Sequence, residues 1–216
     1  DIYRQQMLES LSMYSDELME LLLAEEEVSE ELIHRVTRDA VRQLEMTPVF
    51  MGTAYRNKGV QPLLDAVIRY LPSPLDHTIR AKKVDDETQT MELKVDPKEP
   101  FVGMAFKIVD DPYGQLTFMR IYQGTIKKGE TYFNQRTERK ERFSRIVRMH
   151  AEDREEVDSA SAGDIVAIMG VDAASGDTYA HERGYCTLES MYVPEPVIKV
   201  AVNPASRSDA DKLGKA

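Results

Sequence analysis

The spacing of apolar residues changes near residue 100 of this 216-residue chain, and this change limits the folds open to it. Before that point, apolar side chains recur every three or four residues, which predicts amphipathic helices. The predicted helices cover residues 3–24 (one helix or two), 29–44 and 60–71. From Phe101 onward apolar residues alternate, and turn signals separate short runs at 116–122, 131–134, 143–150, 164–169 and 187–193. The second half is therefore predicted to be a closed barrel or a sandwich.

Residues 47–76 have the pattern that closes many α/β domains. The apolar run 47–51 predicts a buried strand, residues 53–59 a polar loop, and two prolines end the helix that follows. Residues 77–100 are polar and rich in charge, so they are predicted to be a linker. A further strand is predicted over residues 197–202.

Charge is distributed unevenly along the chain. The formal net charge is −10, yet residues 1–46 carry 12 acidic and 4 basic side chains, whereas residues 127–148 carry 8 basic and 3 acidic ones. A basic face is therefore compatible with an acidic protein, and a polyanionic partner is not excluded. A single cysteine, Cys186, excludes an internal disulfide and indicates a reducing compartment. The four histidines lack metal-ligand spacing, and no apolar run reaches the roughly 18 residues that span a bilayer.

Several stretches resemble, in order, the elongation factor G family of translational GTPases. Residues 48–67 and 70–76 are similar to the last strand, the guanine-contacting loop and the final helix of that family's GTPase domain. Similarity to its barrel domain and the start of the next domain continues at residues 105–108, 111–118, 140–151, 154–157, 163–167, 175–178 and 194–198. The resemblance covers nearly the whole chain, whereas residue chemistry alone identifies only a strand, a loop and a helix in the first stretch.

The resemblance implies a multi-domain fold with both α and β structure. Residues 1–76 would be the C-terminal part of a P-loop GTPase α/β domain, made of the end of a helical insert and the last strand and helix. Residues 77–100 would be a linker, and residues 101–193 the translation-factor β-barrel called domain II. Residues 194–216 would be the truncated start of domain III, an α+β domain.

The resemblance also implies functional residues. In the family, the loop that aligns with Thr53 and Ala54 reads Ser-Ala, and a backbone N–H there recognises the guanine carbonyl oxygen. No G-x-x-x-x-G-K-[ST] motif occurs, so this segment is expected to hold neither GTP nor Mg²⁺ and to be inactive alone, whereas the parent protein would be a GTPase that uses both. A second set of residues would contact rRNA phosphates: Arg136, Arg139, Lys140 and Arg142. For each cation, a solvated strand face is the alternative.

The favoured function is that of a segment of a ribosome-dependent GTPase that drives translocation of tRNA and mRNA. The expected partners are the ribosome, through small-subunit rRNA and ribosomal proteins, and GTP or GDP in the full-length protein. Neither DNA nor a membrane is expected, and the expected location is cytoplasmic. Two alternatives remain open: a paralogous ribosomal GTPase of the recycling or tetracycline-protection type, and a stand-alone RNA-binding β-barrel module.

Overall fold

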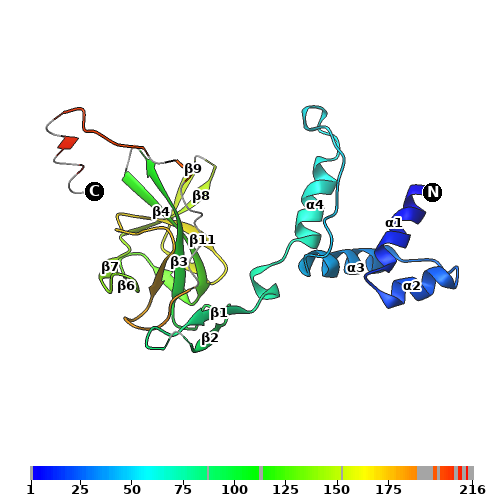
Figure 1. Cartoon of the computed structure of the whole chain (residues 1–216), viewed down its shortest axis with the longest axis horizontal. Coiled ribbons are helices and arrows are strands. Elements are labelled where there is room, and N and C mark those ends of the chain that lie inside the picture. The colour runs from blue at the N-terminus through cyan, green and yellow to red at the C-terminus, as the bar shows by residue number, and fades with distance from the viewer. Residues whose placement is uncertain are drawn as a thin grey trace. The chain divides into compact units, whose positions relative to one another are not determined.

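The computed structural model describes residues 2–86, 88–111, 114–151, 153–188, 197–198, 200–206, 209–210 and 213. The chain divides into two compact units (Figure 1). The first, called the helical unit below, comprises Asp1–Ile79 and Glu92–Val95, and the second, called the β unit, comprises Arg80–Met91 and Asp96–Ala216.

The helical unit contains the helices α1 (Ile2–Ser12), α2 (Asp16–Leu23), α3 (Glu30–Arg42) and α4 (Val60–Tyr70), with the 3₁₀ helices η1 (Ala54–Arg56) and η2 (Pro74–Asp76). Two serines cap helix N-termini: the Ser15 side chain accepts a hydrogen bond from Leu18 N, and that of Ser29 accepts one from Leu32 N. The shared core consists of Leu8, Leu11, Leu18, Val28, Leu32 and Val36. The predicted helices are confirmed, and the first of them forms as two.

Residues 47–51 form no strand, so the strand predicted there is wrong for this structure. A strand needs a neighbouring backbone to pair its N–H and C=O groups, and residues 2–78, all of them described, contain no strand. Val49 and Met51 are 88% and 93% exposed. The segment has the composition of a buried strand but pairs with no strand among residues 2–78.

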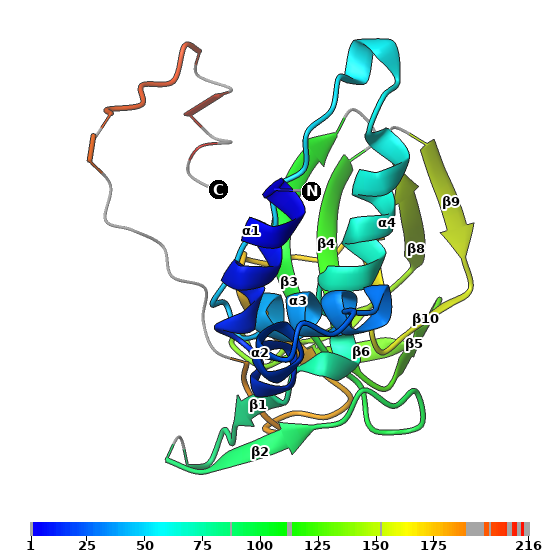
Figure 2. The same cartoon turned by 90° about the vertical axis from the view of Figure 1, so that its right-hand side faces the viewer.

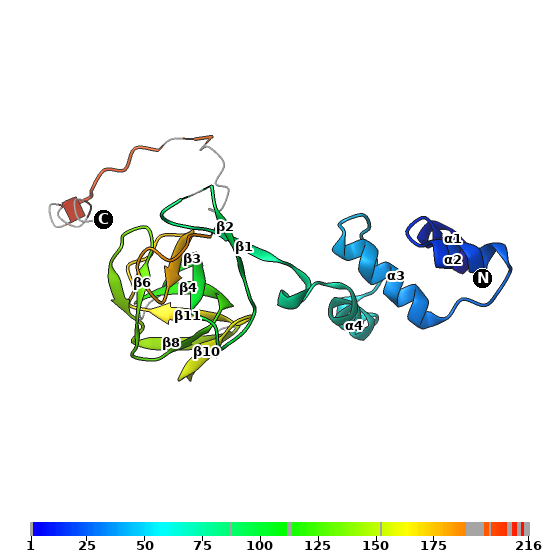
Figure 3. The ribbon, with the colours of Figure 1, turned by 90° about the horizontal axis from the view of Figure 1, so that it is seen from below.

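The β unit is built on an eight-stranded antiparallel sheet that curls on itself (Figures 2 and 3). In spatial order its strands are β7 (Lys140–Arg142), β6 (Thr131–Asn134), β12 (Asp177–Ala180), β3 (Val102–Asp111), β4 (Gly114–Gln123), β11 (Ile165–Met169), β8 (Arg145–His150) and β9 (Asp153–Val157). A separate pair consists of β5 (Thr125–Lys127) and β10 (Ser159–Ser161). The predicted barrel is thus observed as a curled half-barrel in which shorter strands flank the ten-residue strands β3 and β4.

Two strands form inside residues 77–100, the segment that the sequence predicts to be a linker. β1 (Ile79–Lys82) pairs with β2 (Thr90–Leu93) in a two-stranded sheet. Each strand contributes one buried apolar side chain, Ala81 and Leu93. A short sheet therefore orders a stretch whose composition is otherwise polar.

Little of the region after residue 188 can be compared with its prediction. Residues 189–196 lie outside the described chain, and with them most of the strand predicted over 187–193 and part of the start of domain III. The strand predicted over 197–202 is wrong for its described residues, 197–198 and 200–202, which form no strand. Val197 and Val200 are largely exposed, so no neighbouring sheet covers them among the described residues.

The core of the β unit lies inside the curl and includes an aromatic cluster. Ring centroids are 4.7 Å apart between Phe101 and Tyr132, 4.8 Å between Tyr132 and Phe143, and 5.5 Å between Phe143 and Tyr179. Such close aromatic pairs stabilise the folded state by more than the burial of their apolar area alone. Because Tyr132 lies in β6 and Tyr179 in β12, the cluster anchors the β6–β7 hairpin, which carries the basic run.

Candidate functional site

The loop that precedes α4 is closed by two backbone hydrogen bonds. Thr53 N donates to Lys58 O at 3.0 Å, and Lys58 N donates to Thr53 O at 3.2 Å. Between them η1 turns the chain, with Asn57 N donating to Ala54 O at 2.9 Å and Asn57 in the left-handed region at φ +50°. The loop is therefore ordered by its own backbone hydrogen bonds.

Two glycines hold the ends of this loop together. A Cβ on Gly52 would lie 2.8 Å from the carbonyl oxygen of Lys58, and a Cβ on Gly59 would lie 2.8 Å from that of Met51. Gly59 also has φ +77°, a conformation that other residues rarely adopt. Both positions therefore require glycine.

Thr53 and Ala54, the residues predicted to contact guanine, lie exposed on this loop. Ala54 N–H donates no hydrogen bond within the described chain, so this donor can meet an external acceptor. A carbonyl oxygen fits a free N–H, whereas an amino group does not. The residues present therefore fit one edge of a guanine base, and the sequence provides no phosphate-binding loop to accompany them.

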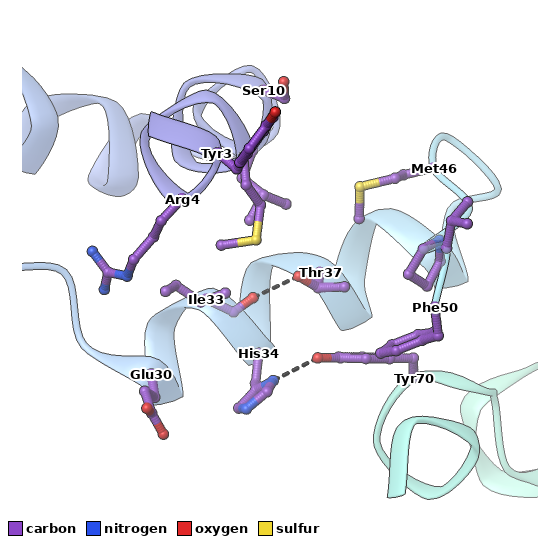
Figure 4. A pocket seen from close by; sticks show the side chains of 14 residues that line it. Tyr3, Arg4, Ser10, Glu30, Ile33, His34, Thr37, Met46, Phe50 and Tyr70 are labelled. Atoms are coloured by element: carbon purple, nitrogen blue, oxygen red, sulfur yellow. Dashed lines mark hydrogen bonds between the residues drawn. The ribbon is translucent and has the colours of Figure 1, made fainter. Parts of the chain in front are cut away.

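A cavity of about 680 Å³ lies between α1, α3 and the segment that precedes the loop (Figure 4). At its edge Thr37 Oγ1 donates to Ile33 O at 2.7 Å, and His34 Nδ1 lies 2.5 Å from Tyr70 Oη. The Tyr70 ring stacks on Phe50, with centroids 6.4 Å apart. The two contacts of Tyr70 join α3, α4 and the segment before the loop.

Two of the four cations predicted to contact rRNA form side-chain hydrogen bonds within the β unit. Arg136 donates through Nε and Nη2 to the two carboxylate oxygens of Asp177, at 2.5 and 2.9 Å. Arg142 Nε donates to Gly129 O at 3.0 Å, across the β6–β7 hairpin. The charge of Arg136 in particular is neutralised by its partner.

The other two cations remain available to an external ligand. Arg139 is exposed, and its side chain forms no hydrogen bond or ion pair with the described residues. Lys140 is also exposed, and its Nζ lies 5.7 Å from the centroid of the Phe133 ring, its cross-strand neighbour. Within the predicted strip, Arg139 and Lys140 are thus an adjacent pair of cations without a hydrogen-bond or ion-pair partner for the side chain among the described residues.

A buried polar network behind the hairpin escaped the sequence analysis. Asn134 Nδ2 donates to Asp177 Oδ2 at 2.8 Å and to Tyr179 Oη at 3.3 Å, and Tyr179 Oη donates to Glu141 Oε2 at 3.1 Å. Asn134 and Tyr179 are fully buried, and Asp177 is 3% exposed. The available signal was a polar residue at one end of each of two short strands, Asn134 at the end of β6 and Asp177 at the start of β12, and spacing alone could not connect these residues across 43 positions.

The two carboxylates of this network are shifted in opposite directions. Burial alone would raise the pKa of Asp177, but hydrogen bonds, first that from Arg136, lower it below its usual value. At Glu141 burial outweighs the hydrogen bond from Tyr179, so the pKa is raised. The network therefore stabilises an ionised Asp177 against Arg136 and resists ionisation of Glu141.

Other kinds of site find no support in the described chain. Its residues include no group of three or more His, Cys, Asp or Glu side chains that could hold a metal ion. Among the same residues, no helix combines the length and apolar character needed to cross a membrane. Cys186 is buried, and burial raises the pKa of its thiol to about 12, which keeps the thiol protonated.

Known proteins are similar to this chain along nearly all of its length. A family model described as elongation factor Tu domain 2 matches residues 114–180. Elongation factor G of Rhodopirellula baltica is 69% identical over 210 residues, which are 97% of this chain and 30% of that relative. Elongation factor G 1 of Borreliella burgdorferi is 45% identical over 213 residues, 99% of this chain and 31% of that relative.

A solved structure is also similar to this chain over its whole length. A crystal structure of a Thermus thermophilus protein has a TM-score of 0.72 and 25% identity, covering 100% of this chain and 30% of that one. The chain therefore spans about 30% of the length of the proteins that it matches.

Proposed function

The chain belongs to the elongation factor G family, and on this premise we propose that it is part of a ribosome-dependent GTPase that drives movement of tRNA and mRNA. The observation that carries the proposal is 69% identity to an elongation factor G over 97% of the chain. The exposed apolar segment 47–51 argues against a stand-alone module, because such a module would bury these side chains. The location that fits this role is the cytoplasm.

Translocation is tested on the full-length protein. Ribosomes should accelerate its GTP hydrolysis, and the protein should advance a ribosome along mRNA by one codon, which toeprinting detects. A recycling paralogue would split ribosomes into subunits and leave the toeprint unmoved, and a tetracycline-protection paralogue would restore translation only in the presence of the drug. Either result would contradict the proposal.

The loop of the helical unit would bind the guanine base. Its contribution would be the free N–H of Ala54, with the hydroxyl of Thr53 beside it. Bound GTP would supply the free energy of phosphate hydrolysis, and residues outside this chain would hold its phosphates and Mg²⁺. The role of this chain toward the nucleotide would be recognition of the base.

The β unit would dock on the small ribosomal subunit through its basic hairpin. Arg139 and Lys140 are adjacent, exposed and without an acidic partner among the described residues. Phosphate backbones bind such cations by releasing condensed counterions. An rRNA backbone is therefore the ligand that this surface fits best.

Charge reversal at the hairpin gives the first prediction. Arg139→Glu with Lys140→Glu in the full-length protein should weaken binding to small ribosomal subunits. The slope of log K against log salt should become shallower by about 0.7–0.9 for each phosphate that the variant no longer binds. GTP affinity of the free protein should not change, because the loop lies in the other unit.

Lys82→Glu with Lys83→Glu provides the matched control, because these exposed lysines give the same change in net charge elsewhere in the β unit. Ribosome affinity measured at two salt concentrations decides the matter. Equal losses of affinity in the two double variants would indicate an effect of net charge, and no loss at Arg139 and Lys140 would remove the hairpin from the site.

A further inference from the structure

We propose that Asp177 is a positioning residue for the β6–β7 hairpin. From its place in β12, Asp177 holds the turn between β6 and β7 in one conformation, so that Arg139 and Lys140 meet RNA phosphates from a rigid backbone. This inference rests on the proposed function, because the ligand is the same rRNA backbone. It also gives Arg136 a different role from the one that the sequence suggests: Arg136 ties the turn to the sheet and does not bind phosphate.

The Asp177 carboxylate is surrounded by donors. Oδ1 accepts from Arg136 Nε at 2.5 Å, and Oδ2 accepts from Arg136 Nη2 at 2.9 Å, Asn134 Nδ2 at 2.8 Å and Ala174 N at 2.9 Å. With 3% of the residue exposed, water competes little for these bonds. A carboxylate bound in this bidentate way fixes the guanidinium plane as well as its charge.

The turn between β6 and β7 is held by its own side chains. Asn134 Oδ1 accepts from Arg136 N at 3.0 Å and from Thr137 N at 3.2 Å. Glu138 lies in the left-handed region at φ +59°, and its carboxylate pairs with Arg183. The two cations that follow the turn therefore begin from a fixed backbone.

A fixed backbone lowers the ordering cost that remains when the cations meet phosphate. Replacing Asp177 by Asn removes the charge that holds Arg136 and turns one acceptor oxygen into a donor. The turn then gains freedom, although Arg139 and Lys140 themselves are unchanged. Asp177 would thus affect RNA binding only through these two residues.

A double-mutant cycle in the full-length protein tests whether Asp177 affects RNA binding through Arg139 and Lys140. Asp177→Asn should weaken binding to small ribosomal subunits by about three- to tenfold. In the Arg139→Glu, Lys140→Glu background the same change should have no further effect, because its targets are gone. Arg136→Gln, at a residue with a largely exposed side chain, should give the same non-additive result and replaces Asp177→Asn if that variant does not fold.

Thr178→Val is the matched control, because Thr178 is the next residue of β12, is also buried, and uses its hydroxyl to accept from Leu188 N at 2.9 Å. This variant should lose stability and keep its ribosome affinity. If Asp177→Asn or Arg136→Gln leaves affinity unchanged, or adds its full effect to that of the charge reversal, the positioning role is wrong while the proposed function stands. If the charge reversal itself has no effect, the hairpin is not part of the ribosome-binding site and the positioning role is wrong as well, whereas the proposed translocation is still decided by the toeprint.

Discussion

Glu141 is a partly buried carboxylate whose pKa is raised, chiefly by burial. The native state keeps this proton at pH values where the unfolded chain has lost it, so the contribution of Glu141 to stability falls as pH rises above its ordinary value of 4.5. Glu141→Gln preserves an acceptor for Tyr179 and removes the charge. The variant should therefore gain stability relative to wild type as pH rises above 4.5, as measured by urea unfolding.

Glu156 provides a control of opposite sign. Hydrogen bonds from Lys128 and Arg145 lower its pKa, so its contribution to stability is present above the ordinary value of 4.5 and is lost as pH falls. Glu156→Gln should lose stability relative to wild type as pH rises through that range. Parallel trends in the two variants would contradict the assignment at Glu141.

At the residue scale the sequence identifies chemical types but not partners. The basic run is evident, yet nothing in its spacing separates Arg136 from Arg139. The two differ because Asp177, 41 residues after Arg136, lies opposite one and not the other. Spacing therefore leaves four equivalent candidate cations, and the fold separates two with hydrogen bonds inside the β unit, Arg136 and Arg142, from Arg139 and Lys140. Neither Asn134 nor Asp177 could be assigned a role before strand pairing was known.

At the element scale, side-chain hydrogen bonds of His34 join α3 to α4. His34 Nδ1 lies 2.5 Å from Tyr70 Oη, and Arg69 Nη1 lies 3.3 Å from His34 Nε2. Tyr70→Phe keeps the ring on Phe50 and removes the hydroxyl. Loss of a partly buried hydrogen bond of this kind costs about 1 kcal/mol. The free energy of opening of α4, measured by native-state hydrogen exchange, should fall by about this amount.

Tyr55→Phe controls for the loss of a tyrosine hydroxyl, because Tyr55 is fully exposed on the loop that precedes α4. It should leave exchange in α4 unchanged, and Tyr70→Phe should leave exchange in the β unit unchanged. An equal effect of both tyrosine variants would show that the contact with His34 does not stabilise the helix pair.

Helices and strands also differ in what the sequence can predict. A helix satisfies its own backbone, so the spacing of apolar residues and the cap at Ser29 suffice to place α3. A strand depends on a neighbour: residues 47–51 have strand composition and form none, whereas β1 and β2 form in a polar segment because they pair with each other. Composition alone cannot distinguish these cases.

At the scale of the whole molecule, the two units differ in how completely they bury their apolar residues. Inside the β unit Met119, Ile121 and Ile146 are almost fully buried. In the helical unit, apolar residues of the segment before the loop and of α4 stay exposed, among them Val49, Met51, Leu64, Val67 and Ile68. The helical unit therefore leaves in contact with water the kind of side chain that the curled sheet of the β unit covers, and the exposed Val197 and Val200 of the β unit lie after that sheet in the chain.

This difference predicts unequal local stability in the isolated chain. Burial of one such side chain is worth about 1.5–3 kcal/mol, so the helical unit forgoes several such contributions that the β unit retains. Hydrogen exchange should therefore show amides of α3 and α4 opening at lower free energy than those of β4 and β11. In the longer protein proposed above, residues 47–71 should gain protection if other parts of that protein cover these exposed side chains, while β4 and β11 should not change. Equal protection of both units in the isolated chain would contradict this expectation, and protection that rises with protein concentration would mean that a second copy covers the surface instead.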